Sequence, residues 1–193
     1  MRRSINKISC IAIMLHICIA GIGWAQGNSA ELSVRKIVEH YCELNSKGKI
    51  LDAGGWIQME ELLSKPDTPR KSPIWVVSHY DVNLVSVKDD TADVIVEYTV
   101  IGKINNNLIF EPFAHSNLPP GEISSSELQV KFHLAKQNDG AHEWRISEVY
   151  LAPLVLVSSA IEYLEDVRKV DPISEYRVNA EKSIAILRNS LKP

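Results

Sequence analysis

The sequence predicts one α+β domain, with N-terminal helices packed on the concave face of a bent antiparallel sheet of two long hairpins and a C-terminal helical hairpin. The spacing of apolar residues changes along the chain from that of helices to that of strands, and then back to that of helices. The strand segments fall into two pairs, each joined by a short turn. The 193 residues are 45% hydrophobic and 23% charged, which excludes disordered, collagen-like and polytopic membrane proteins.

The chain begins with the three parts of a secretory signal. A basic start is followed by an apolar stretch over residues 8–23 and by small residues, and we expect cleavage between Ala25 and Gln26. An uncleaved anchor is the weaker alternative, because this stretch is shorter than the roughly 20 residues of a spanning helix. The adjacent Arg2 and Arg3 also fit a twin-arginine signal. The sequence predicts a periplasmic or secreted protein with no membrane span after cleavage.

Cleavage leaves an acidic chain with a single cysteine. The leader takes 25 of the 193 residues and three of the 21 basic ones, which leaves 168 residues with 18 basic and 24 acidic side chains, a net charge of −6. That balance argues against a nucleic-acid partner. Because Cys42 is the single cysteine after cleavage, an internal disulfide is excluded. Its place in an apolar stripe predicts a buried, inert thiol. Because paired Cys and His spacings and Gly-rich phosphate loops are absent from the sequence, we expect no metal and no cofactor.

Two helices are expected first. Residues 31–45 place apolar side chains at i, i+3, i+4 and i+7, the spacing of an amphipathic helix, and the segment that includes Gly48 ends it. A second, short helix is expected over residues 55–64. Pro66, Pro69 and Pro73 then exclude further helix.

The first hairpin is expected from two alternating segments, 74–87 and 92–104, joined by a turn at 88–91. If paired residue numbers sum to 178, Tyr80 faces Tyr98 on one side of the sheet and Asp81 faces Glu97 on the other.

The second hairpin pairs residues 127–136 with 143–150 around a turn at 138–140. If Leu134 opposes Trp144, then Val130 opposes Glu148. The stretch 105–126 between the hairpins is expected to be irregular, with one short strand near 108–110.

Two helices are expected at the C-terminus. Pro153 opens the first, and Asp171 and Pro172 cap the second. The apolar lines of both helices have helical spacing; they are Leu154, Val157, Ala160, Ile161 and Leu164, and Tyr176, Ala180, Ile184, Leu187 and Leu191. We therefore divide the chain into a signal peptide (1–25), an α+β domain (26–152) and a helical extension (153–193) packed on it.

The order of elements, the appearance of residues 94–103 and the Trp-Arg-Ile of the last strand together resemble the nuclear transport factor 2-like superfamily. Its members are α+β cones in which helices cover the concave face of a strongly bent sheet. The resemblance covers about residues 31–151, and residues 153–193 depart from the family's usual ending. Members include ketosteroid isomerases, polyketide cyclases, dehydratases, secretion-system components and pocket proteins without chemistry, so the resemblance implies a pocket without deciding its function.

The even-numbered strand residues carry the apolar side chains that the helices must cover, and they are therefore expected to face inward. We expect the inner face to form a pocket for a small apolar molecule. Its predicted lining is Tyr80, Val82, Val96, Tyr98, Phe132, Trp144, Glu148 and Tyr150.

An enzyme of the isomerase, cyclase or dehydratase type is the alternative. A buried Glu148 would act as the acid–base residue, with Tyr80 or Tyr98 as a donor to a developing enolate. The ketosteroid isomerases of the superfamily that this chain resembles use a similar combination of tyrosine and acid. This hypothesis requires Glu148 to be buried within hydrogen-bond reach of a tyrosine.

Two other histidine positions are candidates for a site. His79, Asp81 and Glu97 share the outer face and have the composition of a metal site, but water contact alone produces the same polar alternation. His115 lies in the long stretch between the hairpins, where an exposed histidine is the simpler interpretation.

The sequence thus leaves three functions open. The first is an exported, non-catalytic protein that binds a small apolar molecule or a partner protein. The second is the enzyme described above. The third is a homo-oligomeric envelope component, with a homodimer formed through the convex sheet or the last helix.

The leader makes a direct prediction. When the full-length chain is expressed in a secreting bacterium, N-terminal sequencing of the exported protein should begin at Gln26. A chain that is recovered with Met1 in the membrane fraction would contradict cleavage and favour the anchor.

Overall fold

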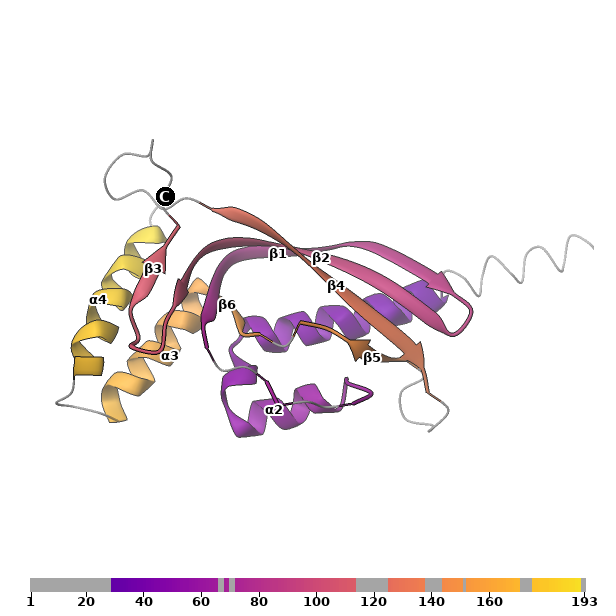
Figure 1. The fold of residues 1–193 in the computed structure, drawn as a ribbon, viewed down its shortest axis with the longest axis horizontal. Helices are drawn as coiled ribbons and strands as arrows, with labels where there is room; N and C mark the ends of the chain where they lie inside the picture. The colour runs from indigo at the N-terminus through magenta and orange to yellow at the C-terminus, as the bar shows by residue number, and fades with distance from the viewer. Residues whose placement is uncertain are drawn as a thin grey trace, which may run out of the picture.

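The computed structural model describes residues 29–65, 68–69, 72–113, 125–137, 144–150, 152–170 and 175–191. In this part of the chain, six strands form one curled sheet in the order β5-β4-β2-β1-β6, with β3 beside β2 (Figure 1). The strands are β1 (Ile74–Lys88), β2 (Thr91–Ile104), β3 (Phe110–Pro112), β4 (Ser126–Lys136), β5 (Trp144–Glu148) and β6 (Leu154–Leu156). The predicted leader, His115, and both residues of the predicted last helix cap lie outside the described residues.

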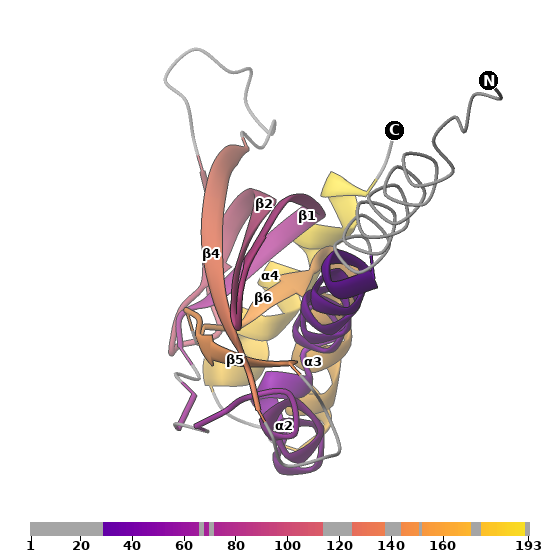
Figure 2. The same cartoon turned by 90° about the vertical axis from the view of Figure 1, so that its right-hand side faces the viewer.

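Helices lie on both sides of this sheet. A helix over residues 29–46, here called the N-terminal helix, and α2 (Ala53–Glu60) lie on the inner side of the curl, and the one-turn η1 (Lys49–Leu51) joins them. The helices α3 (Val157–Val170) and α4 (Glu175–Ser190) form a pair at one end of the sheet (Figure 2). The α+β class and the C-terminal helical pair are therefore confirmed.

The first hairpin has the predicted register. Tyr80 pairs with Tyr98 and Asp81 pairs with Glu97, whereas bulges interrupt the pairing around Val77 and shift it by one residue from Leu84 onward. These bulges bend and twist the long β1–β2 ribbon. Asp89 in the connecting turn has φ 54°, a conformation that aspartate adopts more readily than most residues.

The second hairpin corrects the prediction in register and length. Trp144 pairs with Lys136, Leu134 pairs with Ile146, and Glu148 lies opposite His133 across a bulge. The return strand β5 ends at Glu148 and spans five residues, against eleven in β4. Val130 therefore has no β5 partner among the described residues.

The sheet is mixed, which corrects the prediction of a purely antiparallel one. Residues Leu154–Leu156 form β6 and run parallel to β1, pairing with Trp75, Val76 and Val77. Pro153 therefore precedes a strand, and α3 begins at Val157. A parallel neighbour needs a crossover, and here the chain crosses beneath the sheet from β5 to β6 through residues that include 149–150 and 152–153.

Two hydrophobic cores lie on opposite faces of the sheet. The inner core joins the N-terminal helix and α2 to side chains such as Val96, Phe132 and Trp144. The second core joins α3 and α4 to Val76 and Phe110, together with other residues of β1, β2 and β6. Alternation along the strands explains this division, since neighbouring side chains point to opposite faces.

The predicted apolar line of the last helix is confirmed only in its middle. Ala180, Ile184 and Leu187 are buried, whereas Tyr176 and Leu191 are exposed. Ser183 adds a polar anchor to this face, because its hydroxyl accepts a hydrogen bond from Phe110 N and donates one to Leu108 O.

Asn45 fixes the crossing segment to the N-terminal helix. Its side chain is 1% exposed; Nδ2 donates to Ala152 O at 3.1 Å, and Oδ1 accepts from Leu154 N at 3.2 Å. Trp75 N donates to Pro153 O at 2.9 Å from the other side. The crossing segment is thus held between the helix and β1.

This anchor predicts a stability loss. Asn45→Ala leaves a buried donor and a buried acceptor without partners, so the free energy of unfolding should fall by about 2 kcal/mol. Urea denaturation measures the change, and Asn106→Ala, at an exposed turn position, is the matched control. Equal stability of both variants would show that the crossing segment is held by other contacts.

Candidate functional site

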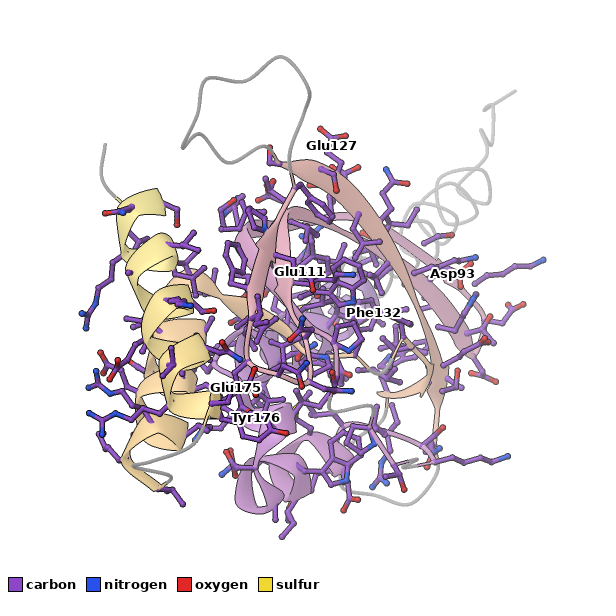
Figure 3. All side chains as sticks on the ribbon, turned by 60° about the vertical axis from the view of Figure 1, so that its left-hand side comes forward. Asp93, Glu111, Glu127, Phe132, Glu175 and Tyr176 are labelled. Carbon is purple, nitrogen blue, oxygen red and sulfur yellow. The ribbon has the colours of Figure 1, made fainter. Side chains whose placement is uncertain are left out.

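The eight residues predicted to line one pocket lie in three different environments. Val96, Tyr98, Phe132 and Trp144 are at most 1% exposed and pack in the inner core, and Figure 3 shows Phe132 inside the curl. Tyr80 and Val82 are half-buried at the edge of the sheet, whereas Glu148 and Tyr150 are exposed. The inward orientation of the even-numbered residues is therefore right in the middle of the sheet, but helices fill the space there.

Glu148 does not meet the condition of the enzyme hypothesis. Its side chain is exposed at the end of β5, and no hydrogen bond joins it to Tyr80 or Tyr98. The register places it opposite His133 on the neighbouring strand. An exposed carboxyl group lacks the desolvation that would prepare it for acid–base work.

The two tyrosines are close to one another and to the single described cysteine. The rings of Tyr80 and Tyr98 are 5.8 Å apart, and Cys42 Sγ lies 3.1 Å from Tyr98 Oη. Burial raises the pKa of the Cys42 thiol to about 12, although the hydrogen bond with Tyr98 acts in the opposite direction. Burial, aided by the neighbouring thiol, also raises the pKa of Tyr98 well above its ordinary value. All these groups are therefore neutral at physiological pH, and the prediction of a buried Cys42 is confirmed.

The outer-face cluster is dispersed among different partners. His79 Nε2 lies 2.9 Å from Asp81 Oδ2, and both side chains are more than half exposed. Glu97 instead accepts hydrogen bonds from Asn83 and Gln129. Among the described residues, no group of three or more His, Cys, Asp or Glu side chains is placed to hold a metal ion.

An apolar pocket opens beside the part of β4 that β5 does not cover, and we call it the Trp75 pocket. Its volume is about 450 Å³, and its apolar walls are Trp75, Val100, Phe113, Leu128, Val130 and Tyr150. The β4 residues 126–131 line one side, because β5 pairs with β4 only from His133 onward among the described residues. Glu127 lies at the start of β4 beside this opening (Figure 3).

The aromatic wall of this pocket is formed by two residues that are far apart in the sequence. The rings of Trp75 and Phe113 are 6.2 Å apart at an angle of 34°, a tilted arrangement that aromatic pairs favour. Among the described residues, Trp75 Nε1 is buried without a hydrogen-bond partner, and the indole ring is held by packing. Tyr150 is 45% exposed and lies on the crossing segment at the same pocket.

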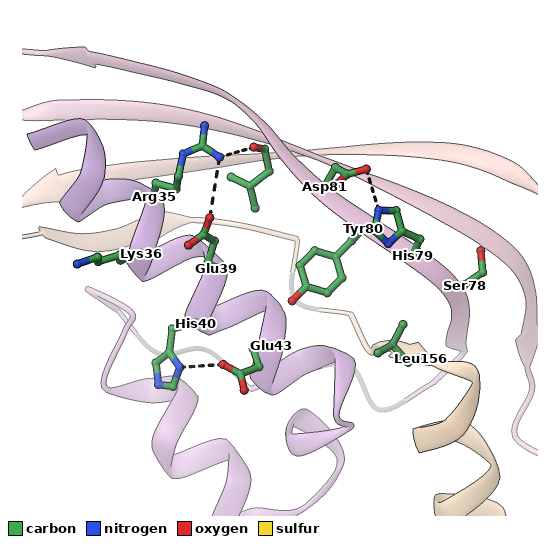
Figure 4. A pocket seen from close by; sticks show the side chains of 11 residues that line it. Arg35, Lys36, Glu39, His40, Glu43, Ser78, His79, Tyr80, Asp81 and Leu156 are labelled. Carbon is green, nitrogen blue, oxygen red and sulfur yellow. Dashed lines mark hydrogen bonds and ion pairs between the residues drawn. The ribbon is translucent and has the colours of Figure 1, made fainter. Parts of the chain in front are cut away.

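A second and larger concavity, which we call the edge groove, lies between the N-terminal helix and β1. Its volume is about 870 Å³, and its lining is Arg35, Lys36, Glu39, His40 and Glu43 on the helix, residues 78–82 on β1, and Leu156 (Figure 4). Arg35 Nη1 donates to Val82 O across the groove and lies 3.9 Å from Glu39 Oε1. Tyr80 has a raised pKa, mainly through burial and also through the nearby Cys42 thiol and Glu43 carboxylate.

Comparisons with known proteins add no relative to this description. No protein-family model, curated protein or solved structure matches the chain. Among the described residues, no helix is both long and apolar enough to cross a membrane.

Sequence reasoning missed most of the lining of both concavities. Tyr150 was predicted and lines the Trp75 pocket, and Tyr80 and Val82 line the edge groove. Trp75 and Phe113 were missed because a bulge changes the face of Trp75, and because Phe113 follows a strand expected to end earlier. The sequence gives no signal for this opening, because it predicts a return strand over 143–150, whereas β5 spans only Trp144–Glu148 and leaves part of β4 uncovered.

The buried thiol predicts a pH dependence of stability. The unfolded thiol ionises near its ordinary pKa of 9.0, whereas the native one stays protonated until about pH 12. Above pH 9 the unfolded state therefore binds fewer protons, and the free energy of unfolding falls by about 1.4 kcal/mol per pH unit from this group. Below pH 9 the contribution is fully present.

Denaturation at pH 8.0 to 10.0 measures this effect. The wild-type chain should lose more stability over this range than Cys42→Ala, and the window ends where the tyrosines begin to ionise in the unfolded state. Parallel curves for the two proteins would contradict a thiol that stays protonated in the native state.

Proposed function

We propose that this protein is an exported, non-catalytic binding protein that holds a small apolar molecule in the Trp75 pocket. The observation that carries the proposal is the pocket's aromatic and aliphatic wall, which lies at the surface and encloses about 450 Å³. Ligand sites of small molecules are concavities of about 300–1,000 Å³ with mostly apolar walls and few polar groups. The export part of the proposal rests on the leader alone.

The position of the pocket agrees with the proposed relation to the nuclear transport factor 2-like cones. In that relation, the curled sheet and the helices beneath it enclose a hollow that opens at one end. Here the helices fill the middle of the curl, and the Trp75 pocket is the part of the inner face that they leave uncovered. A cone with a reduced hollow therefore supports binding at its rim.

The apolar wall favours a neutral, flat ligand. Trp75, Phe113 and Leu128 offer contacts that gain about 25 cal/mol for each Å² of apolar surface removed from water. Among the described residues that line the pocket, the charged ones are the exposed Glu127 and Lys131 at its β4 side. A charged ligand would lose its hydration against the aromatic wall without a buried partner of opposite charge.

Naphthalene tests this proposal as a neutral, planar probe. Equilibrium dialysis should find saturable binding at one site, with an affinity at least fivefold higher than that of 2-naphthalenesulfonate. Leu128→Gln makes the wall polar and should weaken naphthalene binding about tenfold, which corresponds to about 1.4 kcal/mol.

Leu32→Gln is the matched control, because Leu32 is exposed on the N-terminal helix away from the pocket lining. It should leave naphthalene binding unchanged. Partitioning without saturation, or equal binding by the two glutamine variants, would show that the pocket is not the site.

A further inference from the structure

The edge groove is bordered by a sheet edge that is paired at one end and unpaired along the rest. β6 occupies this edge beside Trp75, Val76 and Val77 and then ends at Leu156, where the chain turns into α3. From Ser78 onward, β1 has no further partner on this side among the described residues. The space beside β1 from Ser78 onward is therefore the position that a longer β6 would occupy.

The backbone at this edge is available for hydrogen bonds. Val82 O points into the groove, because Arg35 Nη1 reaches it from the helix. Tyr80 and Val82 have the same parity in the register with β2, so the N–H and C=O of Tyr80 also point outward. These are the groups that pair with a neighbouring strand in a sheet, and among the described residues a side chain satisfies one of them, Val82 O.

The N-terminal helix forms the second wall of the groove and leaves room for one extended chain rather than for a whole sheet. The N-terminal helix runs beside β1, with five polar side chains facing the groove (Figure 4). A second copy of the protein would bring its own sheet and helix against this wall. A single strand needs only one strand spacing of about 4.8 Å beside β1.

The charged side chains of the N-terminal helix also differ between the two ends of the groove. Arg35 and Lys36 lie at the end near Val82, where Glu39 pairs with Arg35. Glu43 lies at the end near Tyr80 and Leu156, where it pairs with Lys47 and His40 (Figure 4). Lys36 is exposed and forms no ion pair with another described residue. A strand that runs parallel to β1, as β6 does, would meet Glu43 first and Lys36 last.

We propose that the edge groove binds an extended peptide segment of a partner protein, which adds to β1 as a parallel strand in continuation of β6. The segment has β-branched residues in its middle, a basic residue near its start and an acidic residue near its end. Main-chain hydrogen bonds to Tyr80 and Val82 hold it, and Arg35 moves from Val82 O to the acidic residue. This site is separate from the Trp75 pocket, and the two proposals stand or fall independently.

Two fluorescent peptides of equal composition test the proposal on the full mature chain. The first is acetyl-Lys-Thr-Val-Thr-Val-Asp-amide, and the second exchanges its two charged residues. Each peptide is titrated with protein, up to millimolar concentration, until its fluorescence anisotropy is saturated. The dissociation constant of the first peptide for the wild type should be about threefold lower than that of the second, which is the size of effect expected of an exposed charge pair. Proline in place of the second threonine should abolish binding, because it removes a main-chain donor.

Lys36→Glu should reverse this preference, so that the second peptide binds more tightly than the first. Lys182→Glu, an equal charge change at an exposed position on α4, is the matched control and should keep the wild-type order. Hydrogen exchange should slow at the Tyr80 and Val82 amides when the first peptide is bound.

Four results would overturn the proposal. They are the absence of saturable binding by either peptide, the opposite preference in the wild type, an unchanged preference in Lys36→Glu, and unchanged exchange at Tyr80 and Val82. A dimer that light scattering detects and that the first peptide dissociates would assign the edge to a second copy instead.

Discussion

The packing of the N-terminal helix against the inner face of β2 is the contact on which the rest of the structure depends. It buries Val34 and Val38 from the helix together with Tyr98 from the sheet, and it places Cys42 against the phenol oxygen of Tyr98. The same helix anchors the crossing segment through Asn45 and forms one wall of the edge groove. One amphipathic helix therefore closes the core with its apolar face and shapes the surface with its polar one.

The unequal lengths of the strands explain where the concavities lie. β1 and β2 are 15 and 14 residues long, whereas the outer strands β5 and β6 have five and three. Each short strand covers only one end of its longer neighbour. The edge groove follows the uncovered part of β1, and the Trp75 pocket follows the uncovered part of β4. Natural sheets protect such edges from aggregation with charged side chains, and here the Arg35 guanidinium donates a hydrogen bond to Val82 O at the edge.

Local patterns predicted the elements well and their neighbours less well. Strict alternation located β1, β2 and β4, and a short turn fixed the pairing of Tyr80 with Tyr98. The identity of β6 could not be predicted in this way, because three apolar residues after Pro153 fit the start of a helix as well as a strand. Only tertiary pairing with β1 decides between them. The candidate pocket failed for a similar reason: alternation shows which side chains point inward, but not how closely a helix approaches them.

The second core gives the C-terminal helices a role in the domain itself. α3 follows β6 without a linker, and it covers Ile74, Val76 and Ile101 on the face opposite the N-terminal helix, while Ser183 ties α4 to the β2–β3 connection. In a shorter ancestor or homologue that ends near residue 152, these side chains would form an exposed hydrophobic surface. It could stay soluble only if polar residues replaced them or if another subunit shielded them, so sequence change at these positions should track the presence or loss of the helical pair during evolution.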